Sequence, residues 1–139
     1  MTTAARTFLN RPASIGAARR FVAEIVDGIA PAMTEPVVLM LSELATNCVR
    51  YEHSDFEVHV DARPDRIRVE VHDDGSGHPI LRSPEPHEAS GRGLQIVNAF
   101  ARSWGVVEVP DQNGKTVWFE VAPNANPLDG AAIPTSAGR

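Results

Sequence analysis

The sequence predicts an α+β domain, a two-layer α/β sandwich in which helices cover one face of a mixed, mostly antiparallel sheet. Three observations support this fold class. Two stretches carry apolar residues at spacings of three and four, which is typical of amphipathic helices. Several shorter stretches alternate apolar and polar residues, which is typical of half-buried strands. Tight turns join two of the strand pairs, and strands joined in this way run antiparallel.

The first predicted elements are a short strand from Ala4 to Leu9 and a helix from Ile15 to Asp27. Ser14 is expected to cap the start of this helix, and Gly28 stands near its end. The apolar stripe of the helix consists of Ile15, Ala18, Phe21, Val22, Ile25, Val26 and Ile29. This stripe predicts that the helix packs one face against the sheet.

A second helix is expected from Thr34, as its N-cap, to about Tyr51, with Pro36 in the first turn. Its apolar face consists of Val37, Val38, Leu41, Leu44, Ala45, Cys48 and Val49. A separate polar stripe on the other side consists of Glu43, Asn47 and Arg50. Taken alone, such a stripe is most often a solvated helix face.

Two strands follow, from Asp55 to Ala62 and from Arg66 to Asp73. In the second strand apolar and polar residues alternate, so that Asp73 should point to the apolar side and Asp74 to solvent. A carboxylate that points inward is costly unless something hydrogen-bonds to it. The end of this strand is therefore a candidate functional position.

A connection of about 15 residues comes next, and connections of this length inside a domain are usually functional lids or disordered segments. A helix is expected from Leu94, followed by strands from Trp104 to Val109 and from Lys115 to Val121. The turn between these strands lies at 111–114. The sequence thus predicts one folded domain over residues 1–121 and a disordered tail over residues 122–139.

The composition of the chain excludes several classes of function. The 139 residues carry a net charge of −5, which argues against general nucleic-acid binding. No apolar run approaches the roughly 20 residues that a membrane span needs, and the first residues do not resemble a signal peptide. The single cysteine, Cys48, cannot form an internal disulfide. We therefore expect a cytoplasmic protein that binds neither nucleic acid nor membranes.

Two glycine clusters stand out. In the first, Gly75 and Gly77 follow the inward Asp73 and leave room for a flat ligand to approach the backbone. In the second, Gly91 and Gly93 stand directly before a predicted helix, whose free N–H groups and positive dipole end suit an anion. Each cluster alone is a weak signal. Together they suggest a carboxylate that recognises a base and a helix end that recognises phosphate.

The order of these motifs resembles the ATP-binding fold shared by DNA gyrase, a heat-shock chaperone and the histidine kinases, known as the Bergerat or GHKL fold. Residues 43–51 look like the N-box of this family, residues 73–77 like its first glycine box and residues 91–97 like its second. The Glu-Leu-x-Thr-Asn form of the N-box and the Lys-Thr-Val-Trp-Phe sequence from Lys115 are most similar to the bacterial anti-sigma-factor serine kinases.

The resemblance implies ATP and Mg²⁺ as cofactors. It implies that Asp73 accepts a hydrogen bond from the adenine amino group, while Gly75 and Gly77 let the backbone pass close to the nucleotide. Asn47 would hold Mg²⁺ through its amide oxygen. Arg50 would offset phosphate charge.

The resemblance also assigns the remaining site residues. The second glycine box would bind the triphosphate through the helix start at Gly91, Arg92, Gly93 and Leu94. Glu43 would be the catalytic residue that orients or deprotonates the attacking hydroxyl. Thr116 would reach the adenine edge, although strand parity places it on the face opposite Val117 and Phe119.

The leading hypothesis is an ATP-binding anti-sigma regulatory factor that acts in transcription regulation as a protein serine/threonine kinase. It would bind a sigma factor and phosphorylate an anti-sigma antagonist protein. An alternative is a non-catalytic ATP-binding interaction module of the same fold, and a third is a chaperone-like ATPase that hydrolyses ATP without a partner. The sequence does not identify the partners, and it leaves open whether the chain forms a homodimer.

Overall fold

The computed structural model of the chain describes residues 1–52, 54–74, 97, 100–108 and 114–122, and the structural statements below concern these residues. Within them, five strands form one sheet in the order β1-β2-β3-β5-β4, and all four pairings are antiparallel. The strands are β1 (Thr2–Phe8), β2 (Phe56–Arg63), β3 (Arg66–Asp73), β4 (Ser103–Glu108) and β5 (Lys115–Val121). The mostly antiparallel sheet that the sequence predicts is therefore confirmed.

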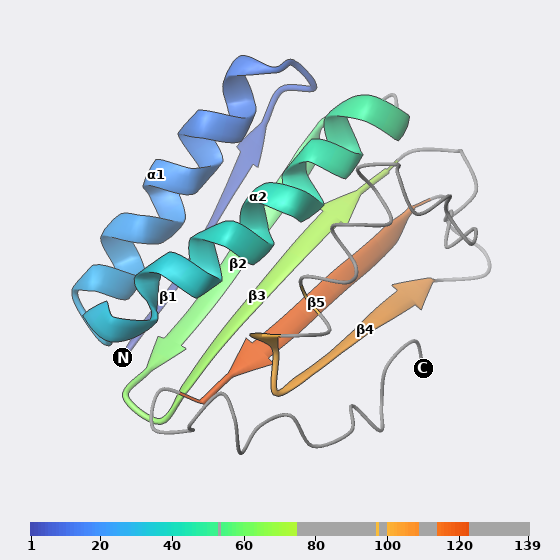
Figure 1. Cartoon of the computed structure of the whole chain (residues 1–139). Coiled ribbons are helices and arrows are strands. Elements are labelled where there is room, and N and C mark those ends of the chain that lie inside the picture. The colour runs from blue at the N-terminus through green and yellow to red at the C-terminus, as the bar shows by residue number, and fades with distance from the viewer. Residues whose placement is uncertain (53, 75–96, 98–99, 109–113, 123–139) are drawn as a thin grey trace.

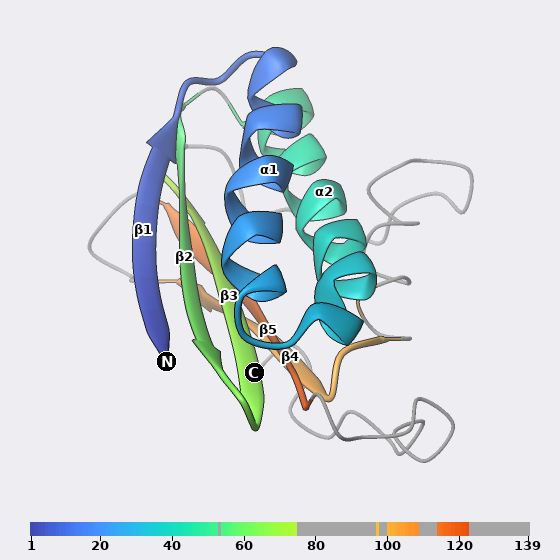
Figure 2. The same cartoon turned by 90° about the vertical axis from the view of Figure 1, so that its left-hand side faces the viewer.

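Two helices, α1 (Ala13–Asp27) and α2 (Thr34–Tyr51), lie on one face of the sheet, and the 3-10 turn η1 (Pro31–Met33) connects them. Figure 2 shows the two layers edge-on, with both helices on the same side. In Figure 1, α1 and α2 lie over the part of the sheet formed by β1, β2 and β3, while β5 and β4 lie beyond α2. These layers confirm the α+β sandwich.

The predicted N-caps of both helices are wrong, whereas Gly28 does end α1. The helix α1 begins at Ala13 after Pro12, whose φ of −56° already suits a helix, and Ser14 lies inside the helix with 7% exposure. The helix α2 does begin at Thr34, but its N-cap is Met33 and no side chain caps it. The Thr34 hydroxyl instead donates a hydrogen bond to Asp27 at the end of α1. A tertiary contact thus replaces the local cap.

The core lies between the helices and the sheet, and strand alternation selects its members. Along β3, buried and partly exposed residues alternate without a break, as the sequence predicts. The inward set from this strand is Ile67, Val69, Val71 and Asp73. Asp73 is 2% exposed, whereas the side chain of Asp74 is 75% exposed, which confirms the predicted orientation of both carboxylates. Because the alternation of β3 continues to its last residue, a carboxylate reaches the edge of an apolar core.

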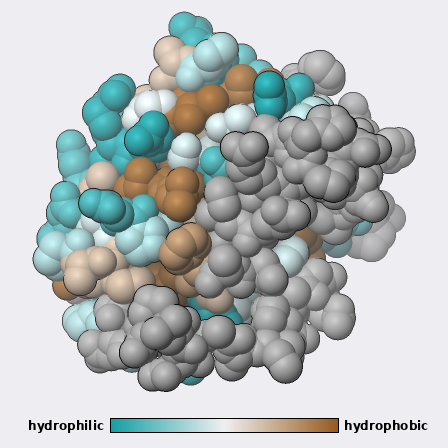
Figure 3. Space-filling model, viewed as in Figure 1, coloured by the Kyte–Doolittle hydropathy of each residue, from teal (hydrophilic) through white to brown (hydrophobic). Residues whose placement is uncertain are grey.

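The outward surface of the helices is mixed in polarity, as Figure 3 shows for this face. Leu39 on α2 is 40% exposed and Phe100 is 47% exposed, and both line a shallow hollow. Single exposed apolar residues are ordinary on protein surfaces, so this face indicates no particular function. Among the described helices, none is long and apolar enough to cross a membrane.

Candidate functional site

The candidate site is a buried cluster of charged side chains at the end of β3. Asp73, the last residue of β3, pairs in the antiparallel ladder with Lys115, the first residue of β5. Residues paired in this way point to the same face of a sheet, so Lys115 also points toward the helices. Its Nζ lies 3.3 Å from Oδ2 of Asp73, and its side chain is 16% exposed. The inward carboxylate is therefore compensated by a partly buried ammonium group.

The end of α2 supplies two more members of this cluster. The Cys48 thiol donates to Oδ2 of Asp73 over 4.0 Å, and Glu52 follows the last residue of α2. Glu52 is only 4% exposed, and its Oε2 accepts a hydrogen bond of 2.7 Å from Nζ of Lys115. We call Cys48, Glu52, Asp73 and Lys115 the charged cluster. It joins α2, β3 and β5 at one point under the helix layer.

The electrostatics of the charged cluster follow from its burial and its charges. Burial opposes the charge of Lys115, but the hydrogen bond that Lys115 donates to Glu52 and the negative charges of Asp73 and Glu52 outweigh it and raise the pKa of Lys115. Lys115 is therefore protonated at neutral pH. Burial, helped by the charge of Asp73, raises the pKa of the Cys48 thiol well above its ordinary value. Cys48 is thus a neutral donor.

A loop side chain fixes the end of α2 that carries this cluster. Asn10 donates from Nδ2 to the backbone oxygens of Cys48, Glu52 and Ser54, at 3.0, 3.1 and 2.8 Å. The last carbonyls of a helix have no partner within the helix, and here Asn10 provides one. The backbone N–H of Asn10 also donates to Asp55 Oδ1 at 2.9 Å. The loop between β1 and α1 therefore sets where Glu52 stands relative to the sheet.

Gly114 allows β5 to begin so close to Asp73. Its φ is +113°, a conformation that favours glycine, and a Cβ at this position would collide with the backbone oxygen of Asp73. The next residue is Lys115, which already pairs with Asp73. A glycine is thus required directly before the residue that contacts the inward carboxylate.

The polar stripe of α2 lies beside the charged cluster. Glu43 and Asn47 are both half-buried, and residues four apart in a helix are neighbours on one side. Asn47 directly precedes Cys48, which contacts Asp73. Arg50 is exposed in the last turn of α2. The structure therefore places two oxygen-bearing side chains, Glu43 and Asn47, on the helix that borders Asp73.

Thr116 does not join these residues. Its hydroxyl lies 2.9 Å from Nδ1 of His72, whose Nε2 is 3.0 Å from Oδ1 of Asp74. His72 and Thr116 pair across β3 and β5 on the outer face, so the sheet separates Thr116 from the Asp73 side chain. The geometry gives no support to a Thr116 contact with adenine, and the position beside Asp73 is occupied by Lys115.

Six predicted site residues lie outside the described residues: Gly75, Gly77, Gly91, Arg92, Gly93 and Leu94. The same is true of the predicted connection, of turn positions 111–113 and of the tail beyond residue 122. The end of the predicted third helix can be compared, because Val97 and Phe100 are helical and the Ala101 N–H donates to the Val97 oxygen at 2.8 Å. These two positions agree with a helix that ends before β4.

Sequence reasoning missed Lys115 and Glu52, although each left a signal. The alternation that places Val117 and Phe119 toward the core also places Lys115 there. Glu52 stands four residues after Cys48, so it continues the apolar face of α2. In each element, a charged residue stands at a position where the pattern indicates an apolar one. The two charged residues, Lys115 and Glu52, form an ion pair.

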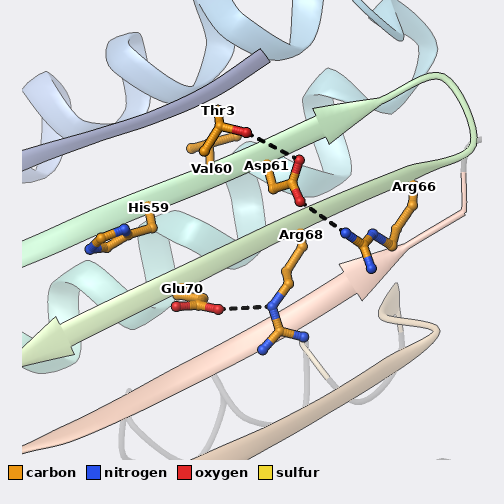
Figure 4. A pocket seen from close by; sticks show the side chains of 7 residues that line it. All are labelled: Thr3, His59, Val60, Asp61, Arg66, Arg68 and Glu70. Carbon is orange, nitrogen blue, oxygen red and sulfur yellow. Dashed lines mark hydrogen bonds and ion pairs between the residues drawn. The ribbon is translucent and has the colours of Figure 1, made fainter. Parts of the chain in front are cut away.

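The outer face of the sheet offers a contrasting group of charges (Figure 4). Arg66 donates to Asp61 at 2.9 Å, and Arg68 donates to Glu70 at 2.8 Å. The Arg68 guanidinium also lies over the Trp118 ring, at 4.2 Å from its centroid. These partly exposed ion pairs are ordinary for a solvated sheet face. The buried cluster at Asp73 is therefore the stronger candidate site.

Comparison with known proteins identifies the family. The family model of the histidine kinase-like ATPase domain matches residues 8–121. The chain belongs to the histidine kinase-like ATPase family. No curated protein matches the sequence.

A solved structure agrees with this family. The histidine kinase domain of the blue-light activated histidine kinase from Erythrobacter litoralis EL346 superposes with a TM-score of 0.56 at 19% identity. The alignment covers 86% of this chain and 65% of that chain, so the chain spans slightly less than two thirds of that domain. At this identity the likeness shows the fold alone. The GHKL resemblance seen in the motifs is thus confirmed, while the anti-sigma subtype stays a prediction.

Proposed function

We propose that this histidine kinase-like ATPase domain binds ATP with Mg²⁺ beside Asp73 and acts as an anti-sigma serine/threonine kinase. In this role it binds a sigma factor and transfers phosphate to a hydroxyl of an anti-sigma antagonist protein. The observation that carries the proposal is the buried Asp73 carboxylate, which ends β3 on the helix side. Glu43 and Asn47 lie half-buried on the neighbouring helix α2.

Asp73 suits the recognition of adenine. A carboxylate is an acceptor, and the exocyclic amino group of adenine is a donor. Because Asp73 is almost fully buried, a hydrogen bond to it forms in a low-dielectric environment and discriminates strongly against a base without that donor. The proposed role thus gives this buried carboxylate a function in base recognition.

The donor set on α2 suits Mg²⁺. The Asn47 amide oxygen and the Glu43 carboxylate are hard oxygen ligands, and they share one side of the helix. Asn47 would hold the ion. An ion held there would supply positive charge to offset that of the phosphates. Arg50, exposed one turn further along α2, adds positive charge on the same helix.

Glu43 would act on the attacking hydroxyl. In the transfer step, the hydroxyl proton passes to the Glu43 carboxylate and the hydroxyl oxygen bonds to the γ-phosphorus. The bond to the bridging oxygen breaks, and ADP leaves. Glu43 is half-buried one helical turn from Asn47, so it stands close to where the metal and phosphates would lie. A carboxylate at this position can accept the proton directly.

The nucleotide site is tested by calorimetry with ATP and Mg²⁺. We expect the wild-type protein to bind and the Asp73→Ala variant to lose binding, because the base loses its acceptor. Asp74→Ala is the matched control, since Asp74 is the adjacent but exposed carboxylate. Unchanged affinity in Asp73→Ala would remove the assignment of the base site.

The kinase activity is tested by transfer of labelled phosphate to an antagonist protein recovered with the chain from its native cells. The Glu43→Ala variant should still bind ATP but should transfer phosphate at least about a hundredfold more slowly. Transfer at the wild-type rate in this variant contradicts the base role. ATP binding without transfer to a verified partner favours the non-catalytic module instead. Hydrolysis that needs no partner favours the chaperone-like ATPase.

A further inference from the structure

The ammonium group of Lys115 has one donor without a partner among the described residues. Lys115 is the only lysine in the sequence. Within the described part of the chain, its Nζ contacts two carboxylates, Glu52 Oε2 at 2.7 Å and Asp73 Oδ2 at 3.3 Å. An ammonium group carries three N–H donors, which point in different directions. Two of them are used by these contacts, so the third is available to a ligand.

Protein contacts hold the ammonium group in place without enclosing the side chain. The backbone of Lys115 is fixed by its ladder pair with Asp73, and the shorter contact of Nζ, to Glu52, holds the ammonium group from the side of α2. The side chains of Glu52 and Asp73 are 4% and 2% exposed, whereas that of Lys115 is 16% exposed. Of these three side chains, Lys115 is therefore the most accessible to a ligand.

Lys115 and Asp73 present a donor and an acceptor side by side, because Nζ and Oδ2 are 3.3 Å apart. Proteins recognise adenine in DNA with the same pattern, when the amide of an Asn or Gln side chain accepts from the exocyclic amino group and donates to the neighbouring ring nitrogen. On adenine, the amino group is flanked by two ring nitrogens that accept hydrogen bonds, N1 and N7. An edge of this base therefore matches the two side chains.

We propose that Lys115 is a specificity-determining residue for the base, which donates a hydrogen bond from Nζ to a ring nitrogen next to the amino group of adenine. The inference rests on the proposed function, in which Asp73 accepts a hydrogen bond from that amino group. Adenine is then recognised at two adjacent positions, the amino group by Asp73 and the ring nitrogen by Lys115.

The other members of the charged cluster do not supply such a donor. An ionised Glu52 carboxylate only accepts hydrogen bonds, and the thiol of Cys48 is a weak donor that already faces Asp73. The next residue on β5, Thr116, lies on the outer face, where its hydroxyl contacts His72. Within the charged cluster, Lys115 is therefore the group that can donate strongly to a ring nitrogen.

The test compares ATP with 1-deaza-ATP and 7-deaza-ATP, in which a C–H group replaces N1 or N7 while the amino group is kept. Calorimetry in the presence of Mg²⁺ measures the Kd of each nucleotide. We expect one of the two analogues to bind wild-type protein at least about tenfold more weakly than ATP, because a hydrogen bond from a charged donor is lost. The analogue that shows the loss identifies the ring nitrogen that Lys115 contacts.

The Lys115→Met variant shows whether this loss depends on Lys115. In this variant the same analogue should bind about as tightly as ATP, because no donor remains to be lost. The two nucleotides are compared within one protein, so any general weakening of the site cancels. In the double variant Lys115→Met with Glu52→Leu, both members of the ion pair are apolar. It leaves no Glu52 carboxylate without its cation and serves if Lys115→Met does not fold.

Arg68→Met is the matched control. Arg68 is also a partly buried cation between two carboxylates, Glu70 and Glu120, but it lies on the outer face of the sheet. This variant should keep the full wild-type difference between ATP and the weaker analogue, because it removes a cation that does not contact Asp73 among the described residues.

The outcomes are distinct from those for the proposed function. If wild-type protein does not bind ATP, the proposed function fails. If wild-type protein binds ATP and Asp73→Ala does not, but both analogues bind wild-type protein as tightly as ATP, only the role of Lys115 is overturned. A loss of affinity for an analogue that is equally large in Lys115→Met also overturns it, because the ring nitrogen then has another partner.

Discussion

At the scale of single residues, the approach of β5 to β3 depends on one glycine. Gly114 adopts a φ of +113°, and its backbone lies against the oxygen of Asp73. A side chain at this position meets backbone, which cannot move aside as a flexible side chain can. The first ladder pair of β5, Asp73 with Lys115, lies directly beside this contact. One backbone conformation therefore positions the whole charged cluster.

We expect Gly114→Ala to destabilise the fold by at least about 2 kcal/mol, through the unfavourable φ and the collision with Asp73. Urea unfolding measures this free energy. Gly16→Ala is the control, because its Cβ would make only ordinary contact with Arg20 and alanine favours the helix α1 by about 0.5–1 kcal/mol. Equal stability of Gly114→Ala and wild-type protein would show that β5 can shift at no cost.

At the scale of elements, the end of α2 is held by Asn10, a residue more than thirty positions away in the chain. Its amide group bonds to three backbone oxygens of the helix end and the following loop. The contact links the turn before α1 to the turn before β2. Since Glu52 belongs to the same helix end, the position of one half of the Lys115–Glu52 pair is determined by this loop.

Asn10→Ala should lower the free energy of unfolding by about 2 kcal/mol, because several hydrogen bonds to part-buried carbonyls are lost together. Chemical denaturation measures the loss, and Arg11→Ala, an exposed neighbour, is the control. We also expect weaker ATP binding at 25 °C in Asn10→Ala, since Glu52 and Cys48 lose a fixed position. A loss of stability without any change in the Kd for ATP would show that the position of the helix end does not affect the nucleotide site.

The elements also show what the sequence could predict. Strands β3 and β5 begin and end where alternation indicates, because a two-residue period directly reflects which side chains are buried. The N-cap of α2 was predicted wrongly because Thr34 bonds to Asp27, a tertiary contact that local patterns do not contain. For the same reason the site was predicted only in part. The inward orientation of Asp73 follows from parity within one strand, whereas its contact with Lys115 requires the order in which β3 and β5 pair.

At the scale of the whole molecule, the charged cluster makes the free energy of unfolding decrease at alkaline pH. The folded state keeps Cys48 protonated above its ordinary pKa of 9.0, so the unfolded chain loses that proton first and stability falls as the pH rises past 9. Lys115 holds its proton above its ordinary pKa of 10.5, and its contribution is likewise lost as the pH rises further. Both groups therefore lower the stability of the folded state as the pH rises.

We expect the melting temperature to decline from about pH 9 upward, with each titrating group contributing about 1.4 kcal/mol per pH unit. Thermal melts from pH 7 to pH 11 measure the decline. In Cys48→Ala the decline should begin about 1.5 pH units higher, near the range of Lys115. A Cys48→Ala curve that runs parallel to the wild-type curve between pH 9 and pH 10.5 would contradict the contribution of the thiol.

The solitary lysine has a practical consequence. Lys115 carries the only primary amine among the side chains of this chain, and ion pairs with Glu52 and Asp73 hold that amine. Reagents that acylate primary amines should therefore label this side chain only when β5 separates from the end of α2. Mass spectrometry of the labelled chain thus counts opening events at this junction without any engineered reporter.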